Sequence, residues 1–168
     1  MKIESVYKLL SYILLPIAGF FAFLDLFAIL AAMAQPAMLL SAFIIASIVI
    51  YTYTSFRFLI TGILQSKPCK HSLKDWIKVN AYVSIFFVVM SYIQTIMILR
   101  EPSIIQTFMG QFLAQQQTNL PAGTTTETFV MMMKGVLYFL AAYATILLAH
   151  IIISFRLLKK YDQVFVQE

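Results

Sequence analysis

Four long apolar stretches constrain the fold of this chain more than any other feature of its sequence. They cover residues 9–33, 37–60, 77–99 and 129–158. A hydrocarbon core of about 30 Å is crossed by about 20 apolar residues in a helix. The stretches are apolar on every face, whereas the strands of a membrane barrel alternate over segments of about 10 residues. The sequence therefore predicts an all-α integral membrane protein with four transmembrane helices, forming one domain over residues 1–168.

The composition supports this class. Hydrophobic residues make up 61% of the chain and charged residues 11%, against about 45–50% and about 25% in a soluble domain. These values exclude a water-soluble globule and a disordered tail, and the single cysteine excludes a disulfide-stapled domain. The spans leave two longer loops, an inner one at 61–76 and an outer one at 100–128.

The lysines and arginines predict the orientation in the bilayer. Ten of the twelve lie near the N-terminus, around the loop 61–76 or near the C-terminus. With four spans these regions share one side of the membrane, and an excess of basic residues marks the cytoplasmic side. We therefore expect a bacterial inner-membrane protein with both termini in the cytoplasm. The net charge of +5 then reflects topology and attraction to anionic headgroups, and we expect no nucleic-acid partner.

Turn signals and short repeats indicate two antiparallel hairpins. Gln35-Pro36 is typical of a tight turn between the first two helices. Two sets of residues also match between the halves of the chain: Ser55-Phe56-Arg57 with Ser154-Phe155-Arg156, and Lys8 and Tyr12 with Lys78 and Tyr82. Duplication of one hairpin into parallel repeats would produce such matching helix ends. Coincidence in a chain rich in a few residue types explains them equally well.

The loop 100–128 contains an amphipathic pattern. Apolar residues recur at helical spacing from residue 104 to residue 113, opposite an uncharged polar side. We expect an interfacial helix at the outer membrane surface. It either covers the helices as a lid or docks a partner, and the candidate docking residues are Ile104, Ile105, Phe108 and Phe112.

Three polar residues at similar depth suggest a contact in the outer half of the membrane. Asp25 lies about 12 Å below the outer boundary, and Lys134 about 7 to 8 Å below it, at about 1.5 Å per residue. Gln94 lies at a similar level. Because an ionisable residue at membrane depth is costly, we expect Asp25 and Lys134 to form a buried pair near Gln94. The pair either fixes helix register or belongs to an ion path; alternatively, Lys134 snorkels outward.

The inner half of the membrane holds a second polar group. His150 lies near the inner end of the fourth stretch, Tyr51 takes the equivalent place in the second, and Asn80 lies at a nearby depth. Histidine titrates near neutral pH, so a proton relay is one interpretation. The other is a neutral histidine that hydrogen-bonds a hydroxyl or a backbone carbonyl across a helix interface.

No pattern in the sequence indicates a metal or a cofactor, and we expect none. Cys69 and His71 supply two candidate ligands, whereas structural zinc takes four. We interpret residues 67–71 as a solvated loop, in which flanking lysines could lower the pKa of the Cys69 thiol. Four basic residues near the helix ends are candidate contacts for lipid headgroups: Arg57, Arg156, Lys159 and Lys160.

These features point to a protein without catalytic activity. Catalysis needs a nucleophile with its base, paired carboxylates or three metal ligands at one depth, and the sequence offers none of these. We therefore predict an accessory or assembly subunit whose partners are the bilayer and either other membrane subunits or further copies of itself. An alternative is an oligomeric small-solute or ion transporter that uses Asp25, Lys134 and His150. A third is an inner-leaflet lipid-binding protein.

Overall fold

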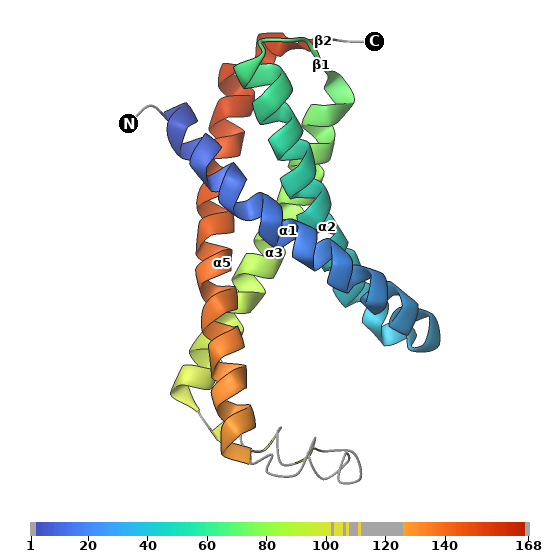
Figure 1. Cartoon of the computed structure of the whole chain (residues 1–168), viewed down its shortest axis with the longest axis vertical. Helices are drawn as coiled ribbons and strands as arrows, with labels where there is room; N and C mark the ends of the chain where they lie inside the picture. The colour runs from blue at the N-terminus through green and yellow to red at the C-terminus, as the bar shows by residue number, and fades with distance from the viewer. Residues whose placement is uncertain (1–2, 102, 106, 108–110, 112–125, 167–168) are drawn as a thin grey trace. The chain divides into compact units, whose positions relative to one another are not determined.

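The computed structural model describes residues 3–101, 103–105, 107, 111 and 126–166. Within this part of the chain, four helices are long and apolar enough to cross a membrane. The all-α class and the four apolar helices expected from the sequence are therefore confirmed. The long helices in Figure 1 are α1 (Ile3–Ala34), α2 (Leu39–Phe58), α3 (His71–Arg100) and α5 (Thr126–Lys160).

The helices extend beyond the apolar stretches, and the loop 61–76 is shorter than expected. The chain continues from α2 into a π-helical segment, η2 (Leu59–Leu64), and then into a two-residue strand, β1 (Cys69–Lys70). α3 already starts at His71. Helical hydrogen bonds continue past the apolar residues because backbone groups need partners wherever water is scarce.

The chain divides into two compact units. Unit 1 comprises Met1–Phe87 and Ile146–Glu168, and unit 2 comprises Val88–Thr145. In unit 1, α1 and α2 pack against each other and are joined by Gln35 and a short 3-10 helix, η1 (Pro36–Met38). In unit 2, the Tyr92 hydroxyl lies 2.8 Å from Thr145 Oγ1 and joins α3 to α5.

The core of unit 1 is formed by one face of each helix. The buried positions in the first half of α1 are Tyr7, Ser11, Leu14 and Ala18, a spacing of three to four residues that keeps them on one side. The large apolar residues on the other sides are exposed, as the 59% exposure of Phe20 illustrates. Such faces suit lipid or a neighbouring helix, since neither offers hydrogen bonds.

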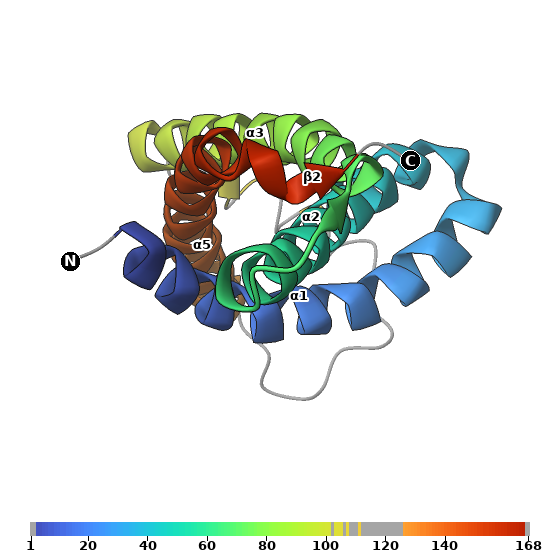
Figure 2. The same ribbon diagram turned by 90° about the horizontal axis from the view of Figure 1, so that it is seen from above.

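The C-terminal segment meets the turn between α2 and α3 at one end of unit 1. β1 pairs in parallel with β2 (Phe165–Val166), which follows a short 3-10 helix, η3 (Asp162–Val164) (Figure 2). We call this the basic end, defined by Lys8, Arg57, Lys67, Lys70, Lys74, Lys78, Arg156, Lys159 and Lys160.

Two ion pairs hold the terminal segments at the basic end. Lys160 Nζ lies 2.6 Å from Glu4 Oε1 and ties the end of α5 to the start of α1. Lys74 of α3 pairs with Asp162 of η3. The Lys74 ammonium holds the pKa of the Asp162 carboxyl below its usual value.

Gly62 allows the strand pair to lie against α2. The Phe58 ring stacks on the Phe165 ring of β2, with centroids 5.4 Å apart. A Cβ at position 62 would lie 2.9 Å from Phe58 Cδ2 and 3.4 Å from Cys69 Sγ. Because Phe58 is fully buried, its ring has little room to move, and the π-helical segment packs closely only without a side chain here.

We predict that Gly62→Ala destabilises the basic end by about 1–3 kcal/mol, the usual cost of overpacking a filled core. The measurement is thermal unfolding in detergent micelles, together with the rate at which a maleimide labels Cys69, the single cysteine of the chain. Gly19→Ala is the control, because a Cβ there meets nothing within 4 Å. Equal labelling rates and melting temperatures in the two variants would contradict the packing argument.

Candidate functional site

Three helices of unit 1 each place an aromatic ring and a serine, four residues apart, on one face. Residues at this spacing are neighbours on a helix surface. All six side chains are buried, with exposed fractions of 0 or 1%. We call them the hydroxyl–imidazole cluster: Tyr7 and Ser11 on α1, Tyr51 and Ser55 on α2, and His150 and Ser154 on α5.

The His150 imidazole joins the three helices. Its Nε2 lies 2.9 Å from Ser11 Oγ, and its Nδ1 lies 2.7 Å from the Tyr51 hydroxyl oxygen. The Tyr7 ring stacks on the imidazole, with centroids 4.6 Å apart and an interplanar angle of 14°. Both ring nitrogens and one ring face are therefore occupied by side chains of α1 and α2.

The hydrogen-bond donors and acceptors around His150 favour one tautomer of its imidazole. Ser11 Oγ donates its proton to the Tyr7 carbonyl oxygen at 2.8 Å, so the same oxygen accepts from His150 Nε2–H. A neutral His150 then accepts the Tyr51 hydroxyl proton at Nδ1, and the same hydroxyl also points toward Ser154 Oγ at 3.1 Å. A neutral imidazole has one donor and one acceptor nitrogen, and we infer that the Nε2–H tautomer fits this arrangement.

A chain of hydroxyls continues from the imidazole toward the basic end. Ser154 Oγ donates to the Tyr7 hydroxyl at 3.1 Å and lies 3.3 Å from Ser55 Oγ. The Tyr7 hydroxyl lies 2.7 Å from Ser55 Oγ and 3.2 Å from the Ser55 carbonyl oxygen, to which it donates. The cluster thus fastens α1 to α2 and to α5 without using any charged group.

Residues that match between the two halves of the sequence occupy corresponding places. Ser55 and Ser154, from the two Ser-Phe-Arg tripeptides, contact each other across α2 and α5. The Tyr12 and Phe56 ring centroids lie 5.6 Å apart, and those of the corresponding Tyr82 and Phe155 lie 5.7 Å apart. The interplanar angles of the two ring pairs differ, 84° and 38°, and duplication and coincidence both stay open as the origin of the repeats.

The structure brings two of the inner polar residues together and leaves the third apart. Tyr51 and His150 are in direct contact, whereas Asn80 Nδ2 donates to the Trp76 carbonyl oxygen of its own helix at 2.8 Å. Tyr7 and Ser11 were not among the site residues predicted from the sequence. The signal that could have found them is the repeated spacing of a ring and a serine four residues later in three helices.

The polar residues of the outer half lie in different units. Asp25 belongs to unit 1, where it is 5% exposed and its Oδ1 has no hydrogen-bond partner among the described residues. Gln94 and Lys134 belong to unit 2, and both side chains are exposed. The contact between Asp25 and Lys134 stays a prediction.

The candidate docking residues of the outer loop are described only in part. Ile104 is 37% exposed and Ile105 is 4% exposed, and both lie in unit 2. Phe108 and Phe112 lie outside the described residues, as does most of the predicted amphipathic helix. Its docking role therefore stays a prediction.

The four basic residues proposed to meet headgroups have different surroundings. Arg57 lines a cavity at the basic end, and Lys160 pairs with Glu4. Arg156 and Lys159 are exposed on α5. Neither of these two is among the residues that line the Arg57 cavity.

The interpretation of residues 67–71 as a solvated loop is wrong for Cys69. Its side chain is 5% exposed, because β1 lies against η2 and pairs with β2. Burial raises the pKa of the Cys69 thiol, and the nearby Arg57 guanidinium offsets part of this increase. The thiol is therefore less reactive than flanking lysines alone would make it. Within the described ranges, no three His, Cys, Asp or Glu side chains are placed to share a metal ion.

A scan of the chain against protein-family models finds no matching family, and searches of curated proteins and of solved structures find no match. The chemistry of the site therefore has to be inferred from its own geometry. Hydroxyls and a neutral imidazole, all buried and hydrogen-bonded to one another, can hold helices in a fixed register.

We predict that Ser11→Ala destabilises unit 1 by about 1 kcal/mol, because it leaves the buried His150 Nε2–H without an acceptor. The control is Ser47→Ala. Ser47 is also buried and also donates to the carbonyl four residues earlier, at 2.8 Å, but it has no bond to His150. Unfolding by denaturing detergent measures both variants, and equal losses of stability would contradict a special role for the imidazole contact.

Proposed function

We propose that this chain is a small non-catalytic subunit of a membrane complex, located in the bacterial inner membrane with both termini in the cytoplasm. The observation that carries the proposal is that both ring nitrogens of His150 are already hydrogen-bonded within the protein. Its two ring nitrogens bond to Ser11 and Tyr51, and its side chain is 1% exposed. The titratable group best placed for chemistry in the inner half thus serves to fasten helices.

The exposed faces of α1 support a subunit that packs against neighbours. Phe23 is 57% exposed, Leu26 62% and Leu30 63%, all in the same helix. A membrane helix with an apolar outer face can bind lipid or another helix, since van der Waals packing drives association in both cases. A complex would cover such a face with apolar helices of its other subunits.

The helix arrangement that we propose is two antiparallel hairpins with an interfacial amphipathic helix in the outer loop. The short turn at Gln35 and η1 between α1 and α2 supports the first hairpin. The contacts between Tyr82 of α3 and Phe155 of α5 support the second, because they repeat those between Tyr12 and Phe56.

Asp25 favours a second candidate function, a small-solute or ion transporter. A carboxyl group buried in a membrane helix is costly unless it is paired, and Asp25 Oδ1 has no partner among the described residues. A transported cation would supply that partner. So would Lys134 or a donor from another subunit, and for this reason the transporter ranks second.

Native mass spectrometry of the tagged protein tests the first proposal. The protein is extracted in a mild detergent from its own host membrane, without overexpression. We predict a stoichiometric complex with other membrane chains. Arrival of the protein alone or only as a homo-oligomer would overturn the proposal of an accessory subunit of a larger complex.

A charged residue introduced into the loop 100–128 tests whether a partner subunit docks there. We predict that Ile104→Asp reduces the recovered partner by about tenfold, because a buried unpaired carboxylate costs at least as much as one lost contact. Thr107→Asp is the control, because it adds the same charge at an exposed polar position of the same segment. Full recovery of the partner with Ile104→Asp would exclude docking at this residue.

The transporter is tested separately with Asp25→Asn in proteoliposomes. The substitution keeps the shape of the side chain but removes its charge, so a transporter loses flux while its helicity and membrane insertion are unchanged. Flux that persists in the variant, or no flux with any small cation in the unaltered protein, would rule out a role for Asp25 in transport.

A further inference from the structure

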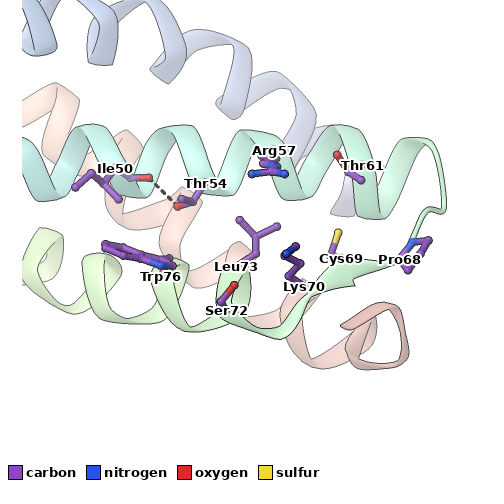
Figure 3. A pocket seen from close by; sticks show the side chains of 10 residues that line it. All are labelled: Ile50, Thr54, Arg57, Thr61, Pro68, Cys69, Lys70, Ser72, Leu73 and Trp76. Carbon is purple, nitrogen blue, oxygen red and sulfur yellow. Dashed lines mark hydrogen bonds between the residues drawn. The ribbon is translucent and has the colours of Figure 1, made fainter. Parts of the chain in front are cut away.

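A cavity of about 570 Å³ opens at the basic end of unit 1 (Figure 3). One of its walls is a single face of α2 and its π-helical continuation. Ile50, Thr54, Arg57 and Thr61 recur there every three to four residues. The cavity therefore follows the helix from its apolar part to its basic end.

The opposite wall comes from the segment that folds back after η2. Lys70 of β1 lines the cavity together with Ser72, Leu73 and Trp76 from the first turns of α3. Figure 3 shows the side chains of the two walls facing a common space between α2 and α3. Pairing of β1 with β2 holds this wall in place, since it fixes the residue next to His71.

The cavity is positively charged. Arg57 and Lys70 line it, and none of its lining residues is acidic. Within the described residues, Arg57 forms no ion pair. Three acids described at this end have partners that do not line the cavity: Glu4 pairs with Lys160, Asp75 with His71, and Asp162 with Lys74.

The two cations of the cavity lie farther toward the basic end than Ile50 and Trp76, and apolar Pro68 also lines that end (Figure 3). Ile50 and Thr61 lie about 16 Å apart along the helix, at about 1.5 Å per residue. Ile50 and Trp76 line the apolar part, whereas Arg57 and Lys70 lie toward the basic end. The Thr54 hydroxyl donates to the Ile50 carbonyl oxygen at 2.7 Å, so the charged donors to a ligand come from Arg57 and Lys70.

We propose that this cavity binds the phosphate-bearing headgroup of an anionic phospholipid, with the phosphate between Arg57 and Lys70 and the upper acyl chain along Ile50 and Trp76. Guanidinium and ammonium groups are the usual partners of phosphate oxygens. Tryptophan is enriched at the level of lipid headgroups. This inference goes beyond the proposed subunit function and does not depend on it.

The dimensions of the cavity favour a lipid over a free ion. Sites for small organic molecules have volumes of about 300–1,000 Å³, and this cavity falls in that range. Inorganic phosphate would fill only the part near the two cations and leave the apolar part empty. A lipid occupies both parts, because it carries the phosphate and the apolar chain on one molecule.

Fluorescence of Trp76 provides a direct readout, because it is the single tryptophan of the chain and is 55% exposed at the cavity. The purified full-length protein in a neutral detergent is titrated with phosphatidylglycerol brominated near the glycerol, which quenches a nearby indole. A parallel titration uses phosphatidylcholine brominated at the same place. Glycerol phosphate and inorganic phosphate are added as competitors of phosphatidylglycerol, and native mass spectrometry counts the lipids that remain bound.

We predict saturable quenching by phosphatidylglycerol that Arg57→Gln with Lys70→Gln weakens by about tenfold or more, the effect expected from losing charged hydrogen bonds. Arg156→Gln with Lys159→Gln is the matched control. It removes the same number of charges from exposed positions outside the cavity, and we expect it to leave the affinity within about twofold.

The possible results distinguish a lipid phosphate from a soluble phosphate, and a specific site from general attraction to a charged surface. Competition by glycerol phosphate or inorganic phosphate would keep the phosphate site but assign it to a soluble ligand. Equal weakening by both double variants would show general surface attraction and overturn the proposal. Absence of quenching, or equal quenching by phosphatidylglycerol and phosphatidylcholine with no loss in the Arg57 and Lys70 variant, would also overturn it.

Discussion

The hydrogen bonds of the His150 imidazole are the contact on which the packing of α1, α2 and α5 depends. Apolar side chains give little preference for one register between membrane helices, because lipid tails are as apolar as leucine. A shift of α5 by one turn would take Nε2 away from Ser11 and Nδ1 away from Tyr51. Both nitrogens would then be buried without partners, at a cost of about 1–3 kcal/mol each. The cluster therefore selects one register.

The position of this cluster can be described by the sequence matches between the two halves of the chain. Tyr51 and His150 stand at equivalent places relative to the two Ser-Phe-Arg tripeptides, and they contact each other. The match of Lys8 with Lys78 makes Ile77 the counterpart of Tyr7, and both are fully buried. Of these two counterparts, only Tyr7 carries a hydroxyl. The hydrogen-bonded cluster is therefore formed with α1, and α3 contributes the apolar Ile77 at the corresponding position.

The sequence predicts which segments form helices, but it does not predict which residues far apart in the chain come into contact. The four apolar helices follow from composition and length alone. Counting residues placed His150 at the level of Tyr51, but it could not select Tyr7, which lies outside the apolar stretch 9–33 and on a face that only packing defines. Cys69 is buried through pairing with Phe165 near the other end of the chain, and no local pattern shows such a contact. Arg57 and Arg156 look equivalent in the sequence for the same reason.

Comparison of His150 with Asp25 separates two uses of ionisable residues in this protein. Both are buried in helices of unit 1, at 1% and 5% exposure. The histidine has a partner on each ring nitrogen, so its environment is complete without any further molecule. Asp25 Oδ1 has none among the described residues, and a carboxyl oxygen in that state lowers the stability of the helices around it. A donor from outside unit 1 would remove that cost. Binding of a partner or a cation at the outer half of α1 would therefore stabilise the protein through Asp25.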